Sequence, residues 1–133
     1  MDFKWDSKYL INVKMLDQQH QELFRLLNRL YELPNNIDCE KKLAEILKNL
    51  LDYTVQHLSL EESMMQKYSY QGFERHFGEH QKFRQEIKQQ TALIDSRELN
   101  IFDLIVFIQD WLTSHIQYSD HKLGLFLNAK GID

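Results

Sequence analysis

The sequence predicts an all-α protein that folds as an up-down-up-down four-helix bundle. Along its 133 residues run four amphipathic segments with apolar residues at helical spacing, and the links between them are short. The chain has only 4 glycines and a single proline, few for a β-rich fold with many turns. Hydrophobic residues make up 43% and charged residues 27%, which is typical of a globular chain with a substantial core.

The first two helices are expected on either side of Pro34. Leucines recur at helical spacing over about 13–33, and Asn12 is a plausible N-cap for this segment. Pro34 and the two asparagines after it end the first helix, because proline is a poor helix residue. The second helix is expected to begin after Asp38, another good N-cap, and to reach about Gln66.

The other two helices follow the same pattern. A short irregular link at 68–72 leads into a third helix over about 73–94. The fourth helix is expected to begin after Asn100, with Asp103 as the second member of a loose capping pair, and to end near Ser119. Because short links leave consecutive helices antiparallel, the four helices should pack as a bundle.

We expect a single domain in which two short pieces lie outside the bundle. The bundle itself is expected over 13–120. An N-terminal arm over 1–12 carries aromatic residues that would pack on the bundle, and a partly apolar C-terminal tail follows over 121–133. The sequence shows neither an internal repeat nor a low-complexity tract.

Composition argues against several classes of function. The formal net charge is -4 and no cluster of Lys and Arg stands out, so a nucleic-acid-binding surface is not expected. The first residues are charged and no apolar stretch is long enough to span a bilayer, so we expect a cytoplasmic protein without a membrane span. Cys39 is the only cysteine, which suits a reducing compartment. The sequence sets neither the oligomeric state nor a protein partner.

The chemistry of the chain is carried by histidines and carboxylates spread over the four helices. His57 and Glu61 are four residues apart, as are His76 and His80, so each pair projects from one face of its helix. Three more residues on the first and fourth helices complete the set: His20, His115 and Asp120. The last two are five residues apart, about 140° beyond a full turn, so the carboxylate needs a distorted helix end to reach the same site.

These residues are expected at one level of the bundle. His80 lies about 15 residues before the turn near Asp95, and His115 lies about 15 residues after the fourth helix begins, so both are some 22 Å from that connection. The pairs on the second and third helices are similarly placed about their link, whereas His20 fits less closely. Taken singly, each histidine is more often an ordinary surface or core residue. Burying five imidazoles and two carboxylates together without a partner would be costly, and bound metal supplies that partner.

The donor set indicates two metal ions, and iron suits it best. Five imidazoles and two carboxylates are too many for one tetrahedral zinc. Two six-coordinate ions offer about twelve positions, of which the histidines, two bridging carboxylates and a bridging oxygen fill about eleven, leaving one open. Mixed imidazole and carboxylate ligation with an open position suits non-haem iron. No glutamate has a histidine three residues later, which argues against the other class of di-iron bundle.

These residues resemble the hemerythrin family, and its single-domain bacterial members in particular. The resemblance covers about 5–120 and rests on Trp5 and on four stretches: 16–20, 57–62, 70–80 and 111–120. It implies that one iron has three histidine ligands, that the other has two, and that two carboxylates and an oxo or hydroxo group bridge them. The three are His76, His80 and His115, the two are His20 and His57, and the bridging carboxylates are Glu61 and Asp120. Gln71 and Asn12 depart from a proline and a glycine common in the family, and both concern loop shape.

The resemblance also implies reversible O2 binding at the open position, on the iron with two histidines. Its use would be oxygen carriage, storage or delivery rather than enzymatic turnover. Such binding needs a pocket that keeps out water and proton donors. Five apolar residues lie beside a ligand or one turn from one and are candidates for that pocket: Leu23, Leu58, Trp111, Leu112 and Ile116. Plain core packing accounts for each of them equally well. Sensing through a partner, and peroxide or nitric oxide chemistry at the same centre, are alternative hypotheses.

Three neighbouring residues are left outside the predicted site. Glu62 points about 100° away from Glu61 on an ideal helix and is expected in solvent. Asp17 either orients a histidine or is an ordinary acid near a helix start. His121 is expected at the surface.

Overall fold

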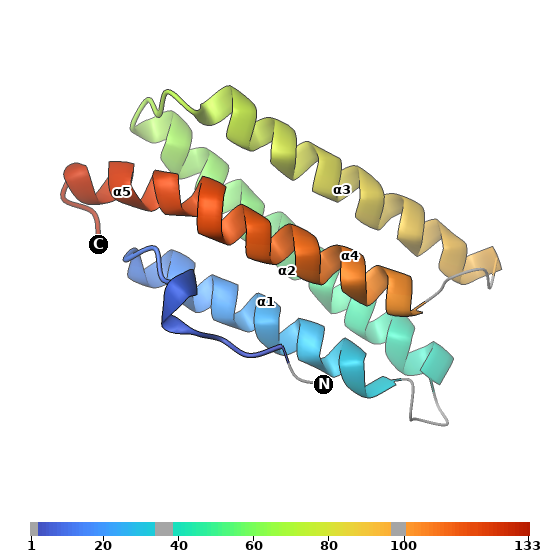
Figure 1. Ribbon diagram of the computed structural model, residues 1–133. Helices are drawn as coiled ribbons and strands as arrows, with labels where there is room; N and C mark the ends of the chain where they lie inside the picture. Colours follow the sequence, from blue (N-terminus) through green and yellow to red (C-terminus); the bar gives the residue numbers. More distant parts are fainter. Residues whose placement is uncertain (1–2, 34–38, 97–100) are drawn as a thin grey trace.

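The computed structural model describes residues 3–33, 39–96 and 101–133, and these residues form helices without any strand. Figure 1 shows the long helices side by side, with consecutive helices running in opposite directions. Their bounds are α1 (Lys14–Glu32), α2 (Cys39–Lys67), α3 (Phe73–Ser96) and α4 (Ile101–Ser114). The predicted all-α four-helix bundle is confirmed. The boundaries expected at Pro34, Asp38 and Asn100 lie outside the described residues.

The start of α1 differs from the expectation. Val13 is the N-cap and makes no side-chain capping bond, so the prediction that Asn12 caps the helix was wrong. Asn12 instead has a φ of 63°, in the left-handed region where asparagine is one of the more tolerated residues after glycine. The Asp17 carboxylate accepts the N–H groups of Ile11 at 2.9 Å and of Asn12 at 3.1 Å. Asp17 therefore anchors the arm to the first turn of α1.

The fourth helix is longer than expected. After α4 the chain continues directly into a π-helical segment, η3 (His115–Asp120), and then into α5 (His121–Ala129). The expected helix end near Ser119 was therefore wrong, and most of the expected tail is helix. The reason is visible in the packing, since Leu123 and Leu127 are both completely buried and extend the apolar face.

The N-terminal arm packs against the bundle, as expected. Its short 3-10 helix, η1 (Ser7–Tyr9), contacts η3. Phe3 stacks on Phe24 of α1 with ring centroids 4.1 Å apart, and Tyr9 meets the same ring edge-on. Gly124 of α5 allows the arm to come close, because a Cβ atom there would lie 2.9 Å from the Cβ of Ile11 and collide with its carbonyl oxygen.

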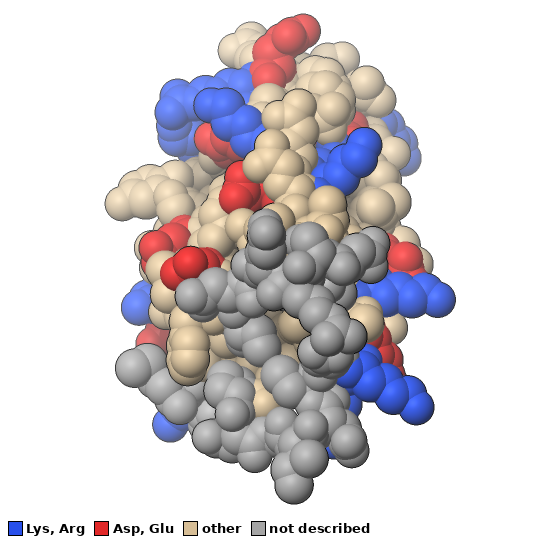
Figure 2. Space-filling view, turned by 90° about the vertical axis from the view of Figure 1, so that its right-hand side faces the viewer, with Lys and Arg blue, Asp and Glu red and all other residues tan. Residues whose placement is uncertain are grey.

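Most of the buried polar residues in the core belong to one cluster. Of the described residues, nine polar or charged ones are buried, and seven of those nine are the predicted metal ligands. The other two are Asp17 and Thr54. On the face in Figure 2, basic and acidic side chains are interspersed, with no single continuous basic area among the coloured residues. Within the described part of the chain, no helix is both long and apolar enough to cross a membrane.

Candidate metal centre

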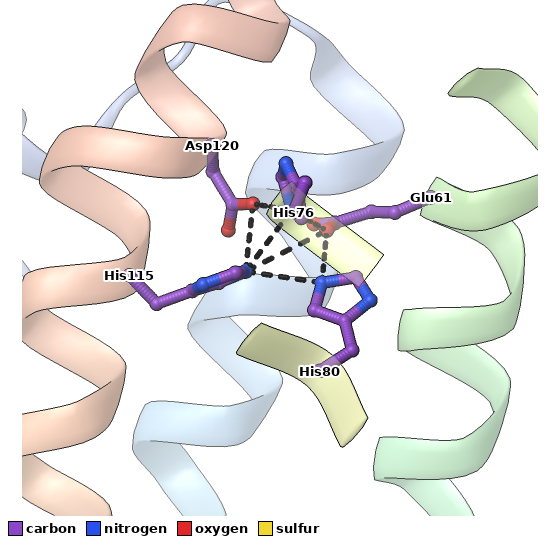
Figure 3. Close-up of side chains that lie close together, drawn as sticks. All are labelled: Glu61, His76, His80, His115 and Asp120. Atoms are coloured by element: carbon purple, nitrogen blue, oxygen red, sulfur yellow. Dashed lines mark hydrogen bonds and ion pairs between the residues drawn. The ribbon is translucent and has the colours of Figure 1, made fainter. Parts of the chain in front are cut away.

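All seven predicted ligands meet in the middle of the bundle. They come from three long helices and from the segment that continues the fourth: His20 from α1, His57 and Glu61 from α2, His76 and His80 from α3, and His115 and Asp120 from η3. Each is at most 5% exposed. Their ligand atoms form two groups that share both carboxylates, and Figure 3 shows the group with three histidines converging on one point.

Each carboxylate faces both groups. Glu61 Oε1 lies 3.1 Å from Nε2 of His76 and equally far from Nε2 of His80, while its Oε2 lies 3.0 Å from Nε2 of His57. Asp120 divides in the same way, with Oδ1 3.0 Å from Nε2 of His76 and Oδ2 2.9 Å from Nε2 of His20. The carboxylates thus span the two groups, as bridging ligands must.

The π-helical segment explains how Asp120 reaches the cluster. A π-helix is wound more loosely than an α-helix and closes its hydrogen bonds five residues apart, so residues at this spacing lie near one face. His115 and Asp120 are the first and last residues of η3, and their Nε2 and Oδ1 atoms are 3.1 Å apart. The distortion that the spacing required is therefore present, and it is confined to the turn that carries both residues.

Three of the five histidines are oriented by an acceptor on a neighbouring helix. In each case the Nδ1–H group donates to an oxygen: His57 to Gln19 at 2.7 Å, His80 to Glu62 at 2.8 Å and His115 to Glu79 at 3.0 Å. Such a bond fixes the tautomer in which Nε2 carries the free lone pair that a metal needs. The Nδ1 atoms of His20 and His76 have no hydrogen-bond partner among the described residues.

The sequence did not reveal these acceptors, and for Glu62 the expectation was wrong. Its side chain is only 15% exposed, and Arg84 of α3 binds its two oxygens at 2.8 and 3.0 Å. The helical wheel placed Glu62 away from Glu61 but could not show that α3 covers that side. Asp17 orients no histidine, since it holds the arm. His121 is exposed, as expected.

The electrostatics of the cluster favour positive charge. Burial opposes charge on His20 and His76, but the carboxylates of Asp120 and Glu61, which lie within 3.4 Å of both imidazoles, outweigh it and raise each pKa to about 9. Burial also opposes ionisation of Glu61 and Asp120, yet the surrounding histidines hold the pKa of each carboxyl below its usual range. Two buried anions therefore draw protons onto His20, His76 and His115 when no other cation balances them, whereas burial lowers the pKa of His57.

Metal ions fit this arrangement better than protons do. Oε2 of Glu61, both nitrogens of His20 and both carboxylate oxygens of Asp120 are buried without a hydrogen-bond partner in the described structure. Adjacent ligands of an octahedral ion with bonds of about 2.1 Å lie about 3 Å apart, which matches the 2.9–3.1 Å separations between most of the ligand atoms. Imidazole and carboxylate donors suit iron.

A small enclosed cavity adjoins the group with two histidines. Its volume is about 10 Å³, and its wall is made of nine residues: Leu23, Leu50, Thr54, His57, Leu58, Phe83, Ile108, Trp111 and Leu112. Four of the five apolar residues predicted for a ligand pocket are among them. Ile116 is completely buried but does not line the cavity, because it lies four residues, about 6 Å along the helix, beyond Leu112.

Comparison with known proteins places the chain in a family. The family model for the hemerythrin HHE cation binding domain matches residues 12–126. The chain belongs to the hemerythrin family. A hemerythrin-like protein of Naegleria gruberi is 33% identical over 120 residues, which cover 90% of this chain and 89% of that protein. A bacteriohemerythrin of Methylococcus capsulatus is 31% identical over 124 residues, 92% of this chain and 94% of its own length. A crystal structure of wild-type hemerythrin aligns with a TM-score of 0.84 and 30% identity over 92% of this chain and 95% of that chain.

Membership of the hemerythrin family identifies the cofactor of the cluster as a di-iron centre. Hemerythrins bind O2 at a di-iron site, and this hemerythrin has a buried His, Glu and Asp cluster suited to hold such a centre. The cofactor that the sequence resemblance implied is thereby confirmed.

A second opening reaches the other side of the cluster. A groove of about 880 Å³ lies between α3 and the continuous helix formed by α4, η3 and α5, and both His76 and His115 line it. Trp111 forms part of its wall and stacks on the His115 ring with centroids 4.3 Å apart. The three-histidine side of this hemerythrin therefore faces an open groove, whereas the two-histidine side faces the small enclosed cavity.

Proposed function

We propose that this hemerythrin holds two iron ions with its seven clustered side chains and binds O2 reversibly, for carriage, storage or local delivery. In this proposal one iron has three histidine ligands, the other has two, and both carboxylates bridge. These roles follow the two groups of ligand atoms: His76, His80 and His115 in one, and His20 and His57 in the other, with Glu61 and Asp120 shared. When bound, the two irons supply the reversible redox chemistry that O2 binding requires.

One observation carries the proposal. The enclosed cavity borders His57, on the side of the cluster that has only two histidines. An ion held by three histidines, two carboxylate oxygens and a bridging oxygen would have about six ligands, whereas an ion held by two histidines would have about five. The cavity would therefore lie beside the ion that could accept a further ligand, and its volume suits a ligand of very few atoms.

The side chains around the cavity support binding that is reversible. Leu23, Leu58 and Leu112 are each at most 6% exposed and present only carbon to the ligand. These three side chains leave little room for water, which would otherwise assist irreversible oxidation. Three residues of the wall carry a polar side-chain atom: His57, Thr54 and Trp111.

The groove favours a second candidate, in which the same centre turns over peroxide or nitric oxide. Turnover needs a reductant, and the groove that reaches His76 and His115 is far larger than an O2 pocket. Its volume is within the range of about 300–1,000 Å³ that small-molecule sites occupy. Turnover at a rate far above autoxidation would favour this candidate over carriage. A partner that co-purifies in one iron state alone would favour sensing.

The test is metal analysis and a visible spectrum through one cycle of deoxygenation and reoxygenation. We expect about two irons per chain and a charge-transfer band that appears with O2 and disappears under argon. His57→Ala should abolish the band, and His121→Ala, which alters an exposed histidine outside the cluster, should leave it unchanged. Immediate oxidation of the reduced protein without a reversible band would refute carriage.

A further inference from the structure

Thr54 is the one buried polar residue of the described chain that neither belongs to the metal cluster nor binds the N-terminal arm. It is 5% exposed, and its hydroxyl has no hydrogen-bond partner among the described residues. It lies on α2 one turn before His57 and lines the cavity beside that histidine. A buried hydroxyl without a partner is unfavourable, so its retention at this position calls for a physical reason.

The other threonines show that the missing bond is specific to Thr54. The chain has three threonines, and all three lie in helices. Thr91 donates to the Ile87 carbonyl at 2.7 Å and Thr113 to the Gln109 carbonyl at 2.9 Å, the usual bond to the residue four positions earlier. Thr54 makes no such bond to the carbonyl of Leu50. Its hydroxyl is therefore left without the acceptor that an α-helix ordinarily provides.

Ordered water is a poor substitute for the missing acceptor. The cavity has room for about one molecule of that size, but an enclosed water needs two to four polar partners. His57 has none to spare, because its Nδ1 is bound to Gln19 and its Nε2 faces Glu61. The remaining wall is almost entirely carbon. A ligand fixed at its other end needs only one further bond, and the hydroxyl can donate it.

We propose that the Thr54 hydroxyl donates a hydrogen bond to the small ligand that occupies this cavity. It thereby selects ligands of two or three atoms whose free end accepts a hydrogen bond, small anions above all. The proposal rests on the proposed function, since it takes the iron beside His57 to hold the other end of the ligand. Thr54 acts here as a specificity-determining residue of the ligand pocket and not as a metal ligand.

Azide is the probe for the test, because it is a linear anion with a hydrogen-bond-accepting end. Azide would be titrated into the iron-loaded, oxidised protein and its binding followed by visible absorption. Thr54→Val removes the hydroxyl with little change of shape and should weaken azide binding between about tenfold and a hundredfold, as expected for a bond to a charged ligand. Thr54→Ser keeps the hydroxyl and should stay within about threefold of the natural chain. Thr91→Val is the matched control and should leave azide affinity unchanged.

Thermal unfolding of the same iron-loaded proteins without azide gives a second measurement. If the hydroxyl is unpaired until a ligand arrives, Thr54→Val should not lower the unfolding midpoint. A fall of about 4 °C or more would reveal a partner inside the protein and overturn the proposal. Equal azide affinity in the natural chain and in Thr54→Val, or no azide binding by the natural iron-loaded chain, would also overturn it. Failure of the proposed function is seen separately, in the iron content and the O2 band of the natural chain.

Discussion

Replacing Glu79 by alanine should weaken iron binding, even though Glu79 is not one of the clustered ligands. Glu79 accepts the Nδ1–H of His115 at 3.0 Å and also accepts the hydroxyl of Ser119. The bond from His115 is the main reason that the Glu79 pKa falls to about 2, so the carboxylate is charged at neutral pH. Without it, His115 loses the acceptor that keeps the proton on Nδ1 and leaves Nε2 free.

The structure sets the size of the expected effect. Loss of an acceptor that orients a metal-binding histidine usually costs about tenfold to a hundredfold in metal affinity, or about 1.4–2.7 kcal/mol. The Glu79 side chain is 32% exposed, so water can partly replace it, and we expect about a tenfold loss. Glu62 is 15% exposed and held by Arg84, so Glu62→Ala should cost more, nearer a hundredfold.

The assay is competition for iron between the protein and a chromogenic chelator at fixed pH. Glu79→Gln retains an acceptor oxygen and should lose less affinity than Glu79→Ala. Glu86→Ala is the control, because Glu86 lies on the same helix and lines the same groove, and its one described side-chain hydrogen bond comes from Gln90. Iron retention by Glu79→Ala equal to that of the natural chain would refute the reasoning, and so would an equal loss in Glu86→Ala.

Three further outcomes are expected. Gly124→Ala should destabilise the protein by about 1–3 kcal/mol in denaturant unfolding, because the added Cβ would collide with Ile11. Its comparison variant is Gly78→Ala, whose added Cβ meets open space and which should stabilise α3 by about 0.5–1 kcal/mol. Leu112→Ala should cost about 2–5 kcal/mol, and by enlarging the cavity it should shorten the lifetime of the O2 band severalfold. Removing iron with a chelator should lower the unfolding midpoint by about 10 °C or more, since metal that binds the folded state alone stabilises it, and a midpoint that does not move would contradict this.

The bundle and most of the donor set could be predicted because both depend on periodicity. Apolar residues at helical spacing define four helices whatever their exact ends. The spacing of four between His57 and Glu61, and between His76 and His80, puts each pair on one face. Family resemblance then supplied His20 and Asp120, whose positions periodicity supported least well.

Departures from ideal helix geometry could not be predicted in the same way. A π-helical turn has no local signal in the residues of η3, and only the five-residue spacing from His115 to Asp120 hinted at it. The continuation into α5 was missed because the sequence near His121 has no proline or glycine cluster that would fix where the helix ends. Glu62 and Glu79 each bind a histidine on a neighbouring helix. Their partners therefore depend on how two helices are rotated relative to each other, and the residue pattern of a single helix does not give that rotation.

The acceptors follow a rule that becomes visible only when the helices are packed. Each is the sequence neighbour of a clustered ligand on its own helix, and each holds the histidine of the next helix along the chain. Gln19 adjoins His20 and holds His57, Glu62 adjoins Glu61 and holds His80, and Glu79 adjoins His80 and holds His115. Sliding any helix by one turn, about 5.4 Å, would therefore break the cluster and its supporting bonds together. The same contacts that set the tautomers fix the register of the bundle, so loss of an acceptor should lower the unfolding midpoint as well as the iron affinity.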